Sequence, residues 1–392
     1  MIKGVKVLGF THYWQGPSAV QNLADLGADV IKIEPPKGAY ERHWSGCNAY
    51  VNGASVFYMM AGRNQRAIAL DLKSEDGLGV IYDLVKEFDV IVENFKVGVM
   101  ERLGLGYEKL KLINPKIIYC SCSGYGATGP KSKQPGQDLL AQGMSGLAEL
   151  SGPGDRPASP VGSPIVDQHG AVLAALGIMA SLYRRAQTGE GCKIDNSLLN
   201  AALDLQQEPL GYFLNGGKLT ERPATGLCSR IHQSPYGVYK TKDGSITLSL
   251  VPYDKLKAMF SPGALDHLKP EDQMDNRIEF DKTVALELLK RSTAEWTAIF
   301  EEQGVWHAPV NYYPDVVADP QVIHNEIIRE LDVPGAGKVK VVNHPVRYNG
   351  HVPPVRRMPP ALGEHTVEVL KEIGYPDDKI AAMLASGAAK GA

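Results

Sequence analysis

The sequence predicts an α/β protein whose large domain holds a doubly wound, mainly parallel sheet. Strand-like and helix-like patterns alternate over residues 5–214, as the crossover connections of a parallel sheet require. Apolar residues make up 44% and charged residues 22% of the 392-residue chain, as in globular proteins. The 41 glycines and 26 prolines follow no collagen-like period, so they indicate many tight loops.

The first βαβ unit is the clearest part of this pattern. Residues 5–10 form an apolar strand, and residues 11–17 form a polar loop that contains glycine and proline. Ser18 can cap the helix that follows, and Gly27 ends it. Residues 28–33 then alternate between apolar and polar side chains, which predicts the second strand.

Strands and helices continue to alternate through the first half of the chain. Further strands are expected at 66–72, 89–92, 116–122 and 193–196. Further helices are expected at 75–88, 97–103, 137–150, 164–185 and 197–214. In the longest of these helices, residues 171–182 are apolar nearly all round, which predicts a helix buried on all sides.

The pattern changes after about residue 216. Two short strands, 236–240 and 246–250, flank Asp243-Gly244, a pair typical of tight hairpin turns. Residues 253–303 are helical and rich in charge, so we expect a smaller α+β domain here. The expected boundaries are a large domain at 1–215 completed by 330–392, a linker at 216–225, and the small domain at 226–325.

Charge, cysteine content and hydropathy exclude several classes of partner. Lys and Arg number 41 against 44 Asp and Glu, so no basic excess exists to bind a nucleic acid. The five cysteines form no C-x-x-C pair, which argues against a zinc knuckle and favours a reducing compartment. The first residues lack the features of a secretory signal, and no apolar run long enough to span a membrane is seen. We therefore expect a soluble, cytoplasmic protein.

Two motifs that could bind a cofactor or a metal fail on their context. Residues 124–129 match the dinucleotide-binding pattern G-x-G-x-x-G and follow a strand. That pattern needs a helix at its third glycine, and Pro130 and Pro135 exclude one, so we expect a flexible loop beside the site. Asp167 and His169 have no third ligand at a useful spacing, so we expect no metal and interpret His169 as structural or solvent-facing.

Asp167 is the strongest candidate for chemistry. Pro164 at the expected helix start places Asp167 in the first turn, where the positive end of the helix favours an ionised carboxylate. An ionised carboxylate in a partly dry site can attack an activated acyl group. An acid at this position can also serve only to stabilise the helix, and position alone leaves both interpretations open.

A series of short motifs runs along the chain in a fixed order. They lie at 11–12, 16–17, 26–34, 64–66, 70–73, 92–95, 123–126, 129–130, 138–142, 188–191, 235–236, 318–322 and 362–366. Each motif alone is weak, but together they cover essentially the whole length. In this order they resemble the class III CoA-transferases, the family that includes formyl-CoA:oxalate and carnitine CoA-transferases.

The resemblance implies a Rossmann-like large domain, a small domain, and two subunits interlocked as a homodimer. It also implies that Asp167 attacks the thioester carbonyl of an acyl-CoA and forms an acyl–aspartyl anhydride. CoA thiolate then attacks the aspartyl carbonyl to give an enzyme–CoA thioester, and the acceptor carboxylic acid reverses these steps. CoA and acyl-CoA are substrates in this scheme, and no tightly bound cofactor is expected.

The resemblance also implies a set of binding residues. The CoA contacts fall on His12, Gln15, Lys73, Asn94, Phe95, Arg102, Gln137 and Asp138. Basic side chains suit the phosphates of CoA. Phe95 can equally belong to the core, and Lys73 and Arg102 can be ordinary surface charges. The acyl pocket is assigned to Trp14, Tyr40 and Trp44, together with the loop at 226–235.

Three departures from the family pattern bear on the substrate. Trp14 stands where the formyl-CoA enzyme has glutamine, which fills space near the acyl pocket and argues against oxalate. The tetraglycine loop of that enzyme has no counterpart. Gln137 stands where related α-methylacyl-CoA racemases have histidine, and an amide cannot carry a proton at neutral pH. A CoA-transferase is therefore preferred over an acyl-CoA racemase or epimerase and over a non-catalytic acyl-CoA-binding protein.

Overall fold

The computed structural model describes residues 1–223 and 229–392. The chain forms two compact units: unit 1 is Met1–Ala141, Pro164–Leu205 and Pro320–Ala392, and unit 2 is Gln142–Ser163 and Gln206–Asp319. Unit 2 therefore includes residues 142–163, which the sequence analysis assigns to the large domain. The expected boundary between the linker and the small domain, at 225–226, lies outside the described residues.

Unit 1 contains a seven-stranded sheet with the order β14-β5-β2-β1-β6-β7-β8. The strands are β1 (Lys6–Phe10), β2 (Asp29–Glu34), β5 (Gln65–Leu70), β6 (Val90–Glu93), β7 (Ile118–Ser123), β8 (Cys192–Ser197) and β14 (Ala389–Lys390). Neighbouring strands run parallel except β14, which pairs antiparallel with β5. The predicted α/β class, with a large and mainly parallel sheet, is confirmed.

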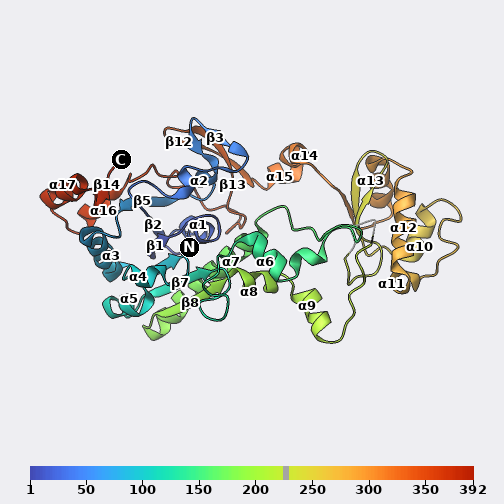
Figure 1. Ribbon diagram of the computed structural model, residues 1–392. Coiled ribbons are helices and arrows are strands. Elements are labelled where there is room, and N and C mark those ends of the chain that lie inside the picture. The colour runs from blue at the N-terminus through green and yellow to red at the C-terminus, as the bar shows by residue number, and fades with distance from the viewer. Residues whose placement is uncertain (224–228) are drawn as a thin grey trace. The chain divides into compact units, whose positions relative to one another are not determined.

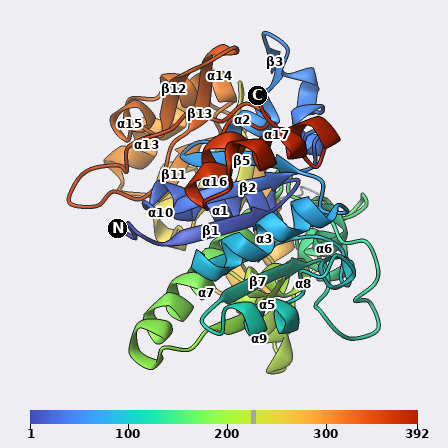
Figure 2. The same ribbon diagram turned by 90° about the vertical axis from the view of Figure 1, so that its left-hand side faces the viewer.

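Helices cover both faces of this sheet (Figures 1 and 2). One face packs against α3 (Glu75–Glu87), α5 (Tyr107–Ile113), α16 (Thr366–Glu372) and α17 (Asp377–Ser386), and the other against α1 (Gln15–Asp25) and α7 (Ile165–Thr188). Successive strand residues alternate between the two cores, so Leu8 lies in one and Val7 in the other. Burial on both faces explains why the strands read as continuous apolar runs.

Shorter elements complete unit 1. They are β3 (Tyr50–Val51), β4 (Ala54–Ser55), α2 (Val56–Met60), α4 (Val99–Arg102), α8 (Leu198–Asp204), α15 (Pro320–His324), β12 (Ile328–Val333) and β13 (Gly337–Val342). β12 and β13 form an antiparallel hairpin whose apolar side chains pack with Tyr58 and Met59 of α2. Helix α6 (Asp138–Met144) begins in unit 1 and ends in unit 2.

The order of the strands reverses at β1. From β1 the chain continues to β2 and β5 on one side and then crosses to β6, β7 and β8 on the other. Phe10 at the end of β1 lies opposite Glu93 at the end of β6. The carboxyl ends of these two strands therefore meet at the reversal point, where open α/β sheets bind their ligands.

Helix α7 departs from the sequence prediction. Ala171, Ala174 and Ile178 are buried against the sheet, but Val172, Leu176 and Tyr183 are 47%, 62% and 69% exposed. The helix is therefore apolar all round without being buried on all sides. By length and composition it is also long and apolar enough to cross a membrane, where the sequence analysis expected no such segment. One side of the helix packs on the sheet through Ala171, Ala174 and Ile178.

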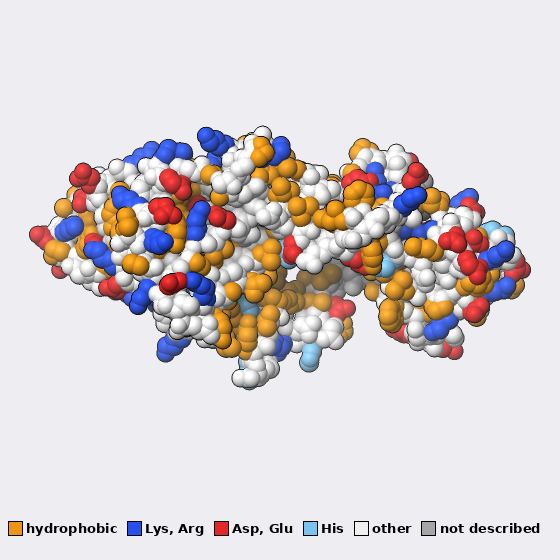
Figure 3. Space-filling model, turned by 90° about the horizontal axis from the view of Figure 1, so that it is seen from below, with side chains coloured by type: hydrophobic (Ala, Val, Ile, Leu, Met, Phe, Trp, Pro, Cys, Tyr) orange, Lys and Arg blue, Asp and Glu red, His pale blue; other side chains and the backbone are white. Residues whose placement is uncertain are grey.

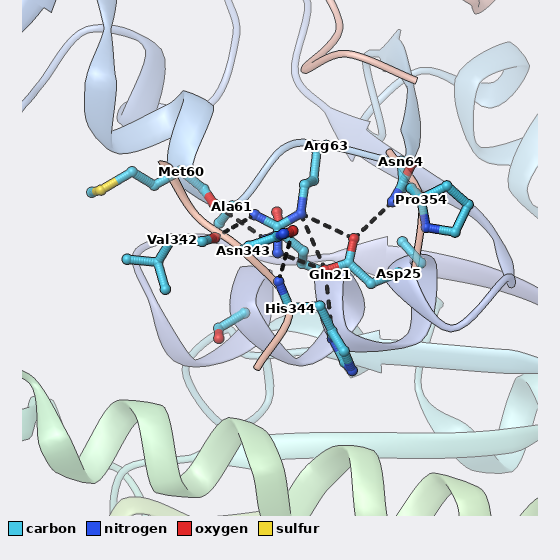
Figure 4. Close-up of polar contacts among 12 residues, drawn as sticks. Gln21, Asp25, Met60, Ala61, Arg63, Asn64, Val342, Asn343, His344 and Pro354 are labelled. Carbon is cyan, nitrogen blue, oxygen red and sulfur yellow. Dashed lines mark hydrogen bonds and ion pairs between the residues drawn. The ribbon is translucent and has the colours of Figure 1, made fainter. Parts of the chain in front are cut away.

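A buried polar cluster ties the C-terminal return of the chain to α1 (Figure 4). Arg63 donates to both carboxylate oxygens of Asp25 at 2.6–3.1 Å and to the Val342 carbonyl at 2.8 Å. Asn64 Nδ2 donates to Asp25 Oδ1 at 2.7 Å, and Asn64 Oδ1 accepts the backbone N–H of Arg356 at 2.5 Å. The ion pair between Asp25 and Arg63 is thus connected by hydrogen bonds to much later parts of the chain, at Val342 and Arg356.

Unit 2 is built around an antiparallel sheet with the order β11-β10-β9. Its elements are α9 (Gln207–Leu214), β9 (Tyr236–Lys240), β10 (Ser245–Ser249), α10 (Tyr253–Met259), α11 (Asp272–Asp275), α12 (Arg277–Leu288), α13 (Thr293–Glu302), β11 (His307–Pro309) and α14 (Tyr313–Ala318). The hairpin of β9 and β10 turns at Asp243-Gly244, as predicted. Trp296, Phe280 and Phe300 are fully buried between the sheet and the helices.

Candidate active site

Asp167 lies in the first turn of α7, as its sequence position predicts. Another acid accepts the free backbone N–H groups at the start of this helix. The N–H groups of Val166 and Asp167 donate to Asp138 Oδ2 at 2.7 and 2.9 Å. Asp138 is buried at the first position of α6. Two carboxylates therefore share the positive end of one helix, and Asp138 takes its hydrogen bonds.

This arrangement corrects the expectation that Asp167 is held ionised by the helix. Burial, followed by the negative charge of Asp138, raises the pKa of Asp167 to about 7. The helix N–H groups that would favour the charged form are already bonded to Asp138. At neutral pH the ionised and protonated forms of Asp167 are therefore present in similar amounts.

The loop between β1 and α1 and the first turn of α1 are bonded to the same turn of α7. Trp14 Nε1 donates to Gln168 Oε1 at 2.9 Å, and Ser18 Oγ donates to the same oxygen at 3.2 Å. Helix α1 packs along α7 beyond this point, and the small Gly170 lets the side chain of Gln15 approach. The first loop of the chain is thereby fixed beside Asp167.

His12 and Asn94 join the loops at the reversal point of the sheet. The backbone N–H of His12 donates to Asn94 Oδ1 at 2.9 Å, and Asn94 Nδ2 donates to the His12 carbonyl at 2.8 Å. His12 Nε2 lies 2.9 Å from the Asn94 carbonyl, so that nitrogen carries the proton. Burial lowers the pKa of His12, although the hydrogen bond to the Asn94 carbonyl acts in the opposite direction. The imidazole is therefore neutral at pH 7. The Phe95 ring lies 5.3 Å from it.

A row of aromatic side chains runs from His12 to Trp14. Ring centroids of successive members, from His12 to Tyr13, Tyr40, Trp44, Phe57 and Trp14, are 4.7, 5.6, 6.1, 4.9 and 5.5 Å apart. The three residues assigned to the acyl pocket therefore belong to one row, and sequence reasoning missed Tyr13 and Phe57. Tyr13 has a positive φ of 58°, a conformation uncommon outside glycine, which turns its ring onto the surface. The assigned loop at 226–235 lies partly outside the described residues.

Glu93 is the functional candidate that sequence reasoning missed most clearly. Its carboxyl group ends β6 and accepts hydrogen bonds from the Ser121 hydroxyl and from the Phe95 backbone N–H, the latter at 2.9 Å. These two hydrogen bonds lower the pKa of Glu93, but burial has the larger effect and raises it to about 7. An acidic residue at the end of the apolar run Val90–Glu93 is the signal that could have identified it.

The remaining predicted residues do not share these contacts. Lys73 and Arg102 are exposed and follow β5 and β6 at the same edge of the sheet. Gln137 is exposed directly before Asp138. His169 lies 2.6 Å from Asp204 of α8, which fits its structural interpretation. Across the described residues no group of three or more His, Cys, Asp or Glu is arranged to hold a metal ion.

Comparison with known proteins identifies the family. The model of CoA-transferase family III matches residues 2–366. Human succinyl-CoA:glutarate CoA-transferase is 35% identical over 395 residues, covering 98% of this chain and 89% of that protein. Succinate–glutarate CoA-transferase of Agrobacterium fabrum is 31% identical over 95% of each chain, and succinyl-CoA:mesaconate CoA-transferase of Haloarcula hispanica is 31% identical over 94% of this chain and 96% of its own.

A solved structure agrees with these relatives. A CAIB/BAIF family protein from Brucella suis superimposes with a TM-score of 0.81 at 29% identity, over 95% of this chain and 98% of that one. The family model and the whole-length matches lead to one conclusion. The chain belongs to CoA-transferase family III and is a CoA-transferase.

Proposed function

We propose that this enzyme moves CoA from succinyl-CoA to a second dicarboxylic acid through Asp167. The relatives above are named for succinyl-CoA or succinate paired with glutarate or mesaconate, and each of these acids carries two carboxylates. The observation that carries the proposal is the half-buried Asp167 in a chain of this family: its backbone N–H donates to Asp138, and its neighbour Gln168 is bonded to Trp14.

In the proposed reaction, an Asp167 oxygen attacks the thioester carbonyl of succinyl-CoA. The carbon–sulfur bond breaks, CoA leaves as thiolate, and a succinyl–aspartyl anhydride forms. The thiolate then attacks the side-chain carbonyl of Asp167, which releases succinate and leaves a CoA thioester on the enzyme. The acceptor carboxylate repeats the two steps in reverse. Each step exchanges one acyl bond for another, so no ATP is consumed.

The raised pKa of Asp167 supports this role. A carboxylate with a pKa of about 7 is more basic than an ordinary aspartate, and a more basic oxygen is a stronger nucleophile toward a thioester. Burial also removes part of its hydration, which otherwise has to be displaced before attack. Asp138 supports the same property, because its negative charge contributes to the shift.

We assign substrate contacts around this nucleophile. The CoA contacts are His12, Gln15, Lys73, Asn94, Phe95, Arg102, Gln137 and Asp138, and the acyl pocket is lined by Trp14, Tyr40 and Trp44. The paired His12 and Asn94 support this assignment because they fix both loops at the reversal point. Lys73 and Arg102 are exposed at that sheet edge, where cations suit phosphates. CoA enters as substrate, with no tightly bound cofactor.

We further propose a Rossmann-like unit 1, a small domain near 226–325, and a cytoplasmic, interlocked homodimer. The reversal of strand order at β1 supports the first. The exposed stripe on α7, formed by Val172, Leu176 and Tyr183 at helical spacing, supports a second copy as its cover. Other apolar side chains lie in groups on the surface shown in Figure 3.

Trapping the enzyme–CoA thioester tests the proposed function. Wild-type enzyme incubated with succinyl-CoA and no acceptor should gain the mass of CoA less one water at Asp167, and hydroxylamine should release the CoA. Asp167→Ala and Asp167→Asn should form no adduct and transfer no CoA. Asp378→Asn removes an exposed aspartate from the first turn of α17 and is the matched control. An unmodified wild type, or an active Asp167→Ala enzyme, contradicts the proposal.

A further inference from the structure

Gln15 has a buried side-chain amide that the fold does not satisfy. Gln15 is the first residue of α1 and is only 4% exposed. Among the described residues, its Nε2 has no hydrogen-bond acceptor. Burying an unpaired amide is unfavourable, and such groups are rare in native proteins. An unpaired buried amide therefore either binds a ligand or reacting group through its free donor, or lowers the stability of the protein.

The position of this amide connects it to Asp167. A Cβ atom added to Gly170 would lie 2.5 Å from Gln15 Nε2, so the glycine leaves the space that the amide occupies. Gly170 is three residues after Asp167 in α7, and residues at this spacing lie on one face of a helix. The neighbouring Trp14 is bonded to Gln168, which fixes the loop on that same turn. The free N–H groups of Gln15 are thus held one helical turn from the nucleophile.

The donors that usually stabilise charge at a helix start are already occupied here. Val166 and Asp167 donate their backbone N–H groups to Asp138. Attack on an acyl–Asp167 carbonyl moves an electron pair onto its oxygen, and the resulting oxyanion needs a hydrogen-bond donor. A neutral amide that has no other acceptor meets this need without reorganisation of the site.

We infer that Gln15 is a catalytic residue whose Nε2 donates a hydrogen bond to the oxyanion formed at the Asp167 carbonyl. This inference rests on the proposed function and gives Gln15 a role beyond contact with CoA. The bond forms only after Asp167 is acylated, so it stabilises the transition state more than the bound substrate. Its loss should lower kcat by a larger factor than the lost CoA contact raises KM.

The test compares Gln15→Leu with wild type in a single turnover. Leu preserves an unbranched Cβ and similar bulk while removing the donor. We expect the enzyme–CoA thioester to form about a hundredfold more slowly, as for loss of other oxyanion donors. We also expect the unfolding temperature to stay the same or rise, because the variant no longer buries an unpaired amide. A purely structural role for Gln15 predicts a lower unfolding temperature instead.

Gln21→Leu is the matched control on the same helix. Gln21 is 8% exposed and donates Nε2 to the Met60 carbonyl at 3.2 Å, as Figure 4 shows, while its Oε1, a buried acceptor, has no partner among the described residues. Replacing it should lower the unfolding temperature and leave the rate of adduct formation within about twofold of wild type. The two variants therefore separate a catalytic amide from a structural one by opposite effects.

Gln15→Glu provides a second variant if the leucine variant does not fold. It keeps the shape of the side chain and replaces the donor with an acceptor, so the rate should fall at least as far. Adduct formation within twofold of wild type in either variant overturns the inference, as does a rate loss that parallels a loss of folded protein. Failure of wild type to form the adduct instead contradicts the proposed function itself.

Discussion

At the scale of single residues, the shared helix start of Asp138 and Asp167 sets the chemistry. Only the ionised form of Asp167 can attack a thioester, and its pKa is raised to about 7 by burial and by Asp138. We expect the rate of adduct formation to rise about tenfold per pH unit below pH 7 and to level off above it. Quenched-flow mass spectrometry from pH 5.5 to 8.5 measures this profile.

Glu93 is the necessary comparison, because its pKa is also raised to about 7. The Glu93→Gln variant should keep the inflection near pH 7 if Asp167 is responsible for it. Loss of the inflection in that variant, or a flat profile in wild type, contradicts the assignment to Asp167.

The carboxyl group of Asp167 also makes the stability of the protein depend on pH. Asp167 binds its proton more tightly when folded than when unfolded, where its pKa is near 3.8. The stability from this proton is fully present below pH 4 and is lost as pH rises to about 7. We expect Asp167→Asn to match wild type at pH 4 and to unfold about 2–4 °C higher at pH 8. Calorimetry at both pH values checks this, and a lower unfolding temperature at pH 8 contradicts it.

At the scale of elements, the junction of β1 with α1 depends on one glycine. A Cβ atom at Gly16 would lie 2.8 Å from Asn94 Oδ1 and 2.9 Å from Thr11 Cβ. Gly16→Ala should push Asn94 away from His12, lower the free energy of unfolding by about 1–3 kcal/mol, and raise KM for acyl-CoA. Gly79→Ala in α3 meets nothing within 4 Å and serves as control. Unchanged KM in Gly16→Ala argues against the assigned role of the His12–Asn94 pair.

Sequence patterns predicted a strand or helix well where a single property, such as burial on both faces, determines its residues. Strands β1, β2, β6 and β7 were predictable because both faces of each are buried. The expected helix at 197–214 is instead two helices, α8 and α9, since the periodicity of side chains does not reveal a break in the backbone. The exposed stripe on α7 was not predictable either, because apolarity does not specify what covers it.

The candidate site also combines features that local sequence predicts with features that only tertiary packing determines. Asp167 stands at an expected helix start, and His12 and Asn94 stand in motifs of the family, so the sequence and the resemblance suggest them as site residues. The raised pKa of Asp167 depends on its burial and then on Asp138, 29 residues away, which accepts its backbone N–H. The free amide of Gln15 depends on the packing of α1 against α7. Both are tertiary properties that no local pattern encodes.

At the scale of the whole molecule, the stripe on α7 predicts the state of the protein in solution. Light scattering should give about twice the 42.5 kDa mass of one chain if a second copy covers this stripe. Leu176→Glu places a charge in the middle of the stripe and should shift the protein toward monomer. Leu112→Glu alters a leucine of α5 that is 84% exposed and should leave the mass unchanged. A monomeric wild type contradicts the proposed homodimer.

The Asp25–Arg63 ion pair supports unit 1 as a whole. Arg63 and Asp25 are 5% and 3% exposed, so removing one leaves the other charge buried. Arg63→Leu should lower the free energy of unfolding by about 3–5 kcal/mol. The double variant Asp25→Leu, Arg63→Leu should recover part of this loss, because it removes both charges. Urea unfolding of the three proteins checks the prediction, and a loss below about 1 kcal/mol in the single variant contradicts it.

The same cluster has a consequence for synthesis on the ribosome. Arg63 and the Val342 carbonyl that it contacts are 279 residues apart, and Asn64 accepts from Arg356 still later in the chain. At the usual 5–20 residues per second, roughly 15–60 s separate the translation of these partners. Unit 1 can close only when its last segment has left the ribosome. The nascent chain therefore exposes an unfinished core for most of its synthesis, and that interval is when it is most open to aggregation and to chaperones.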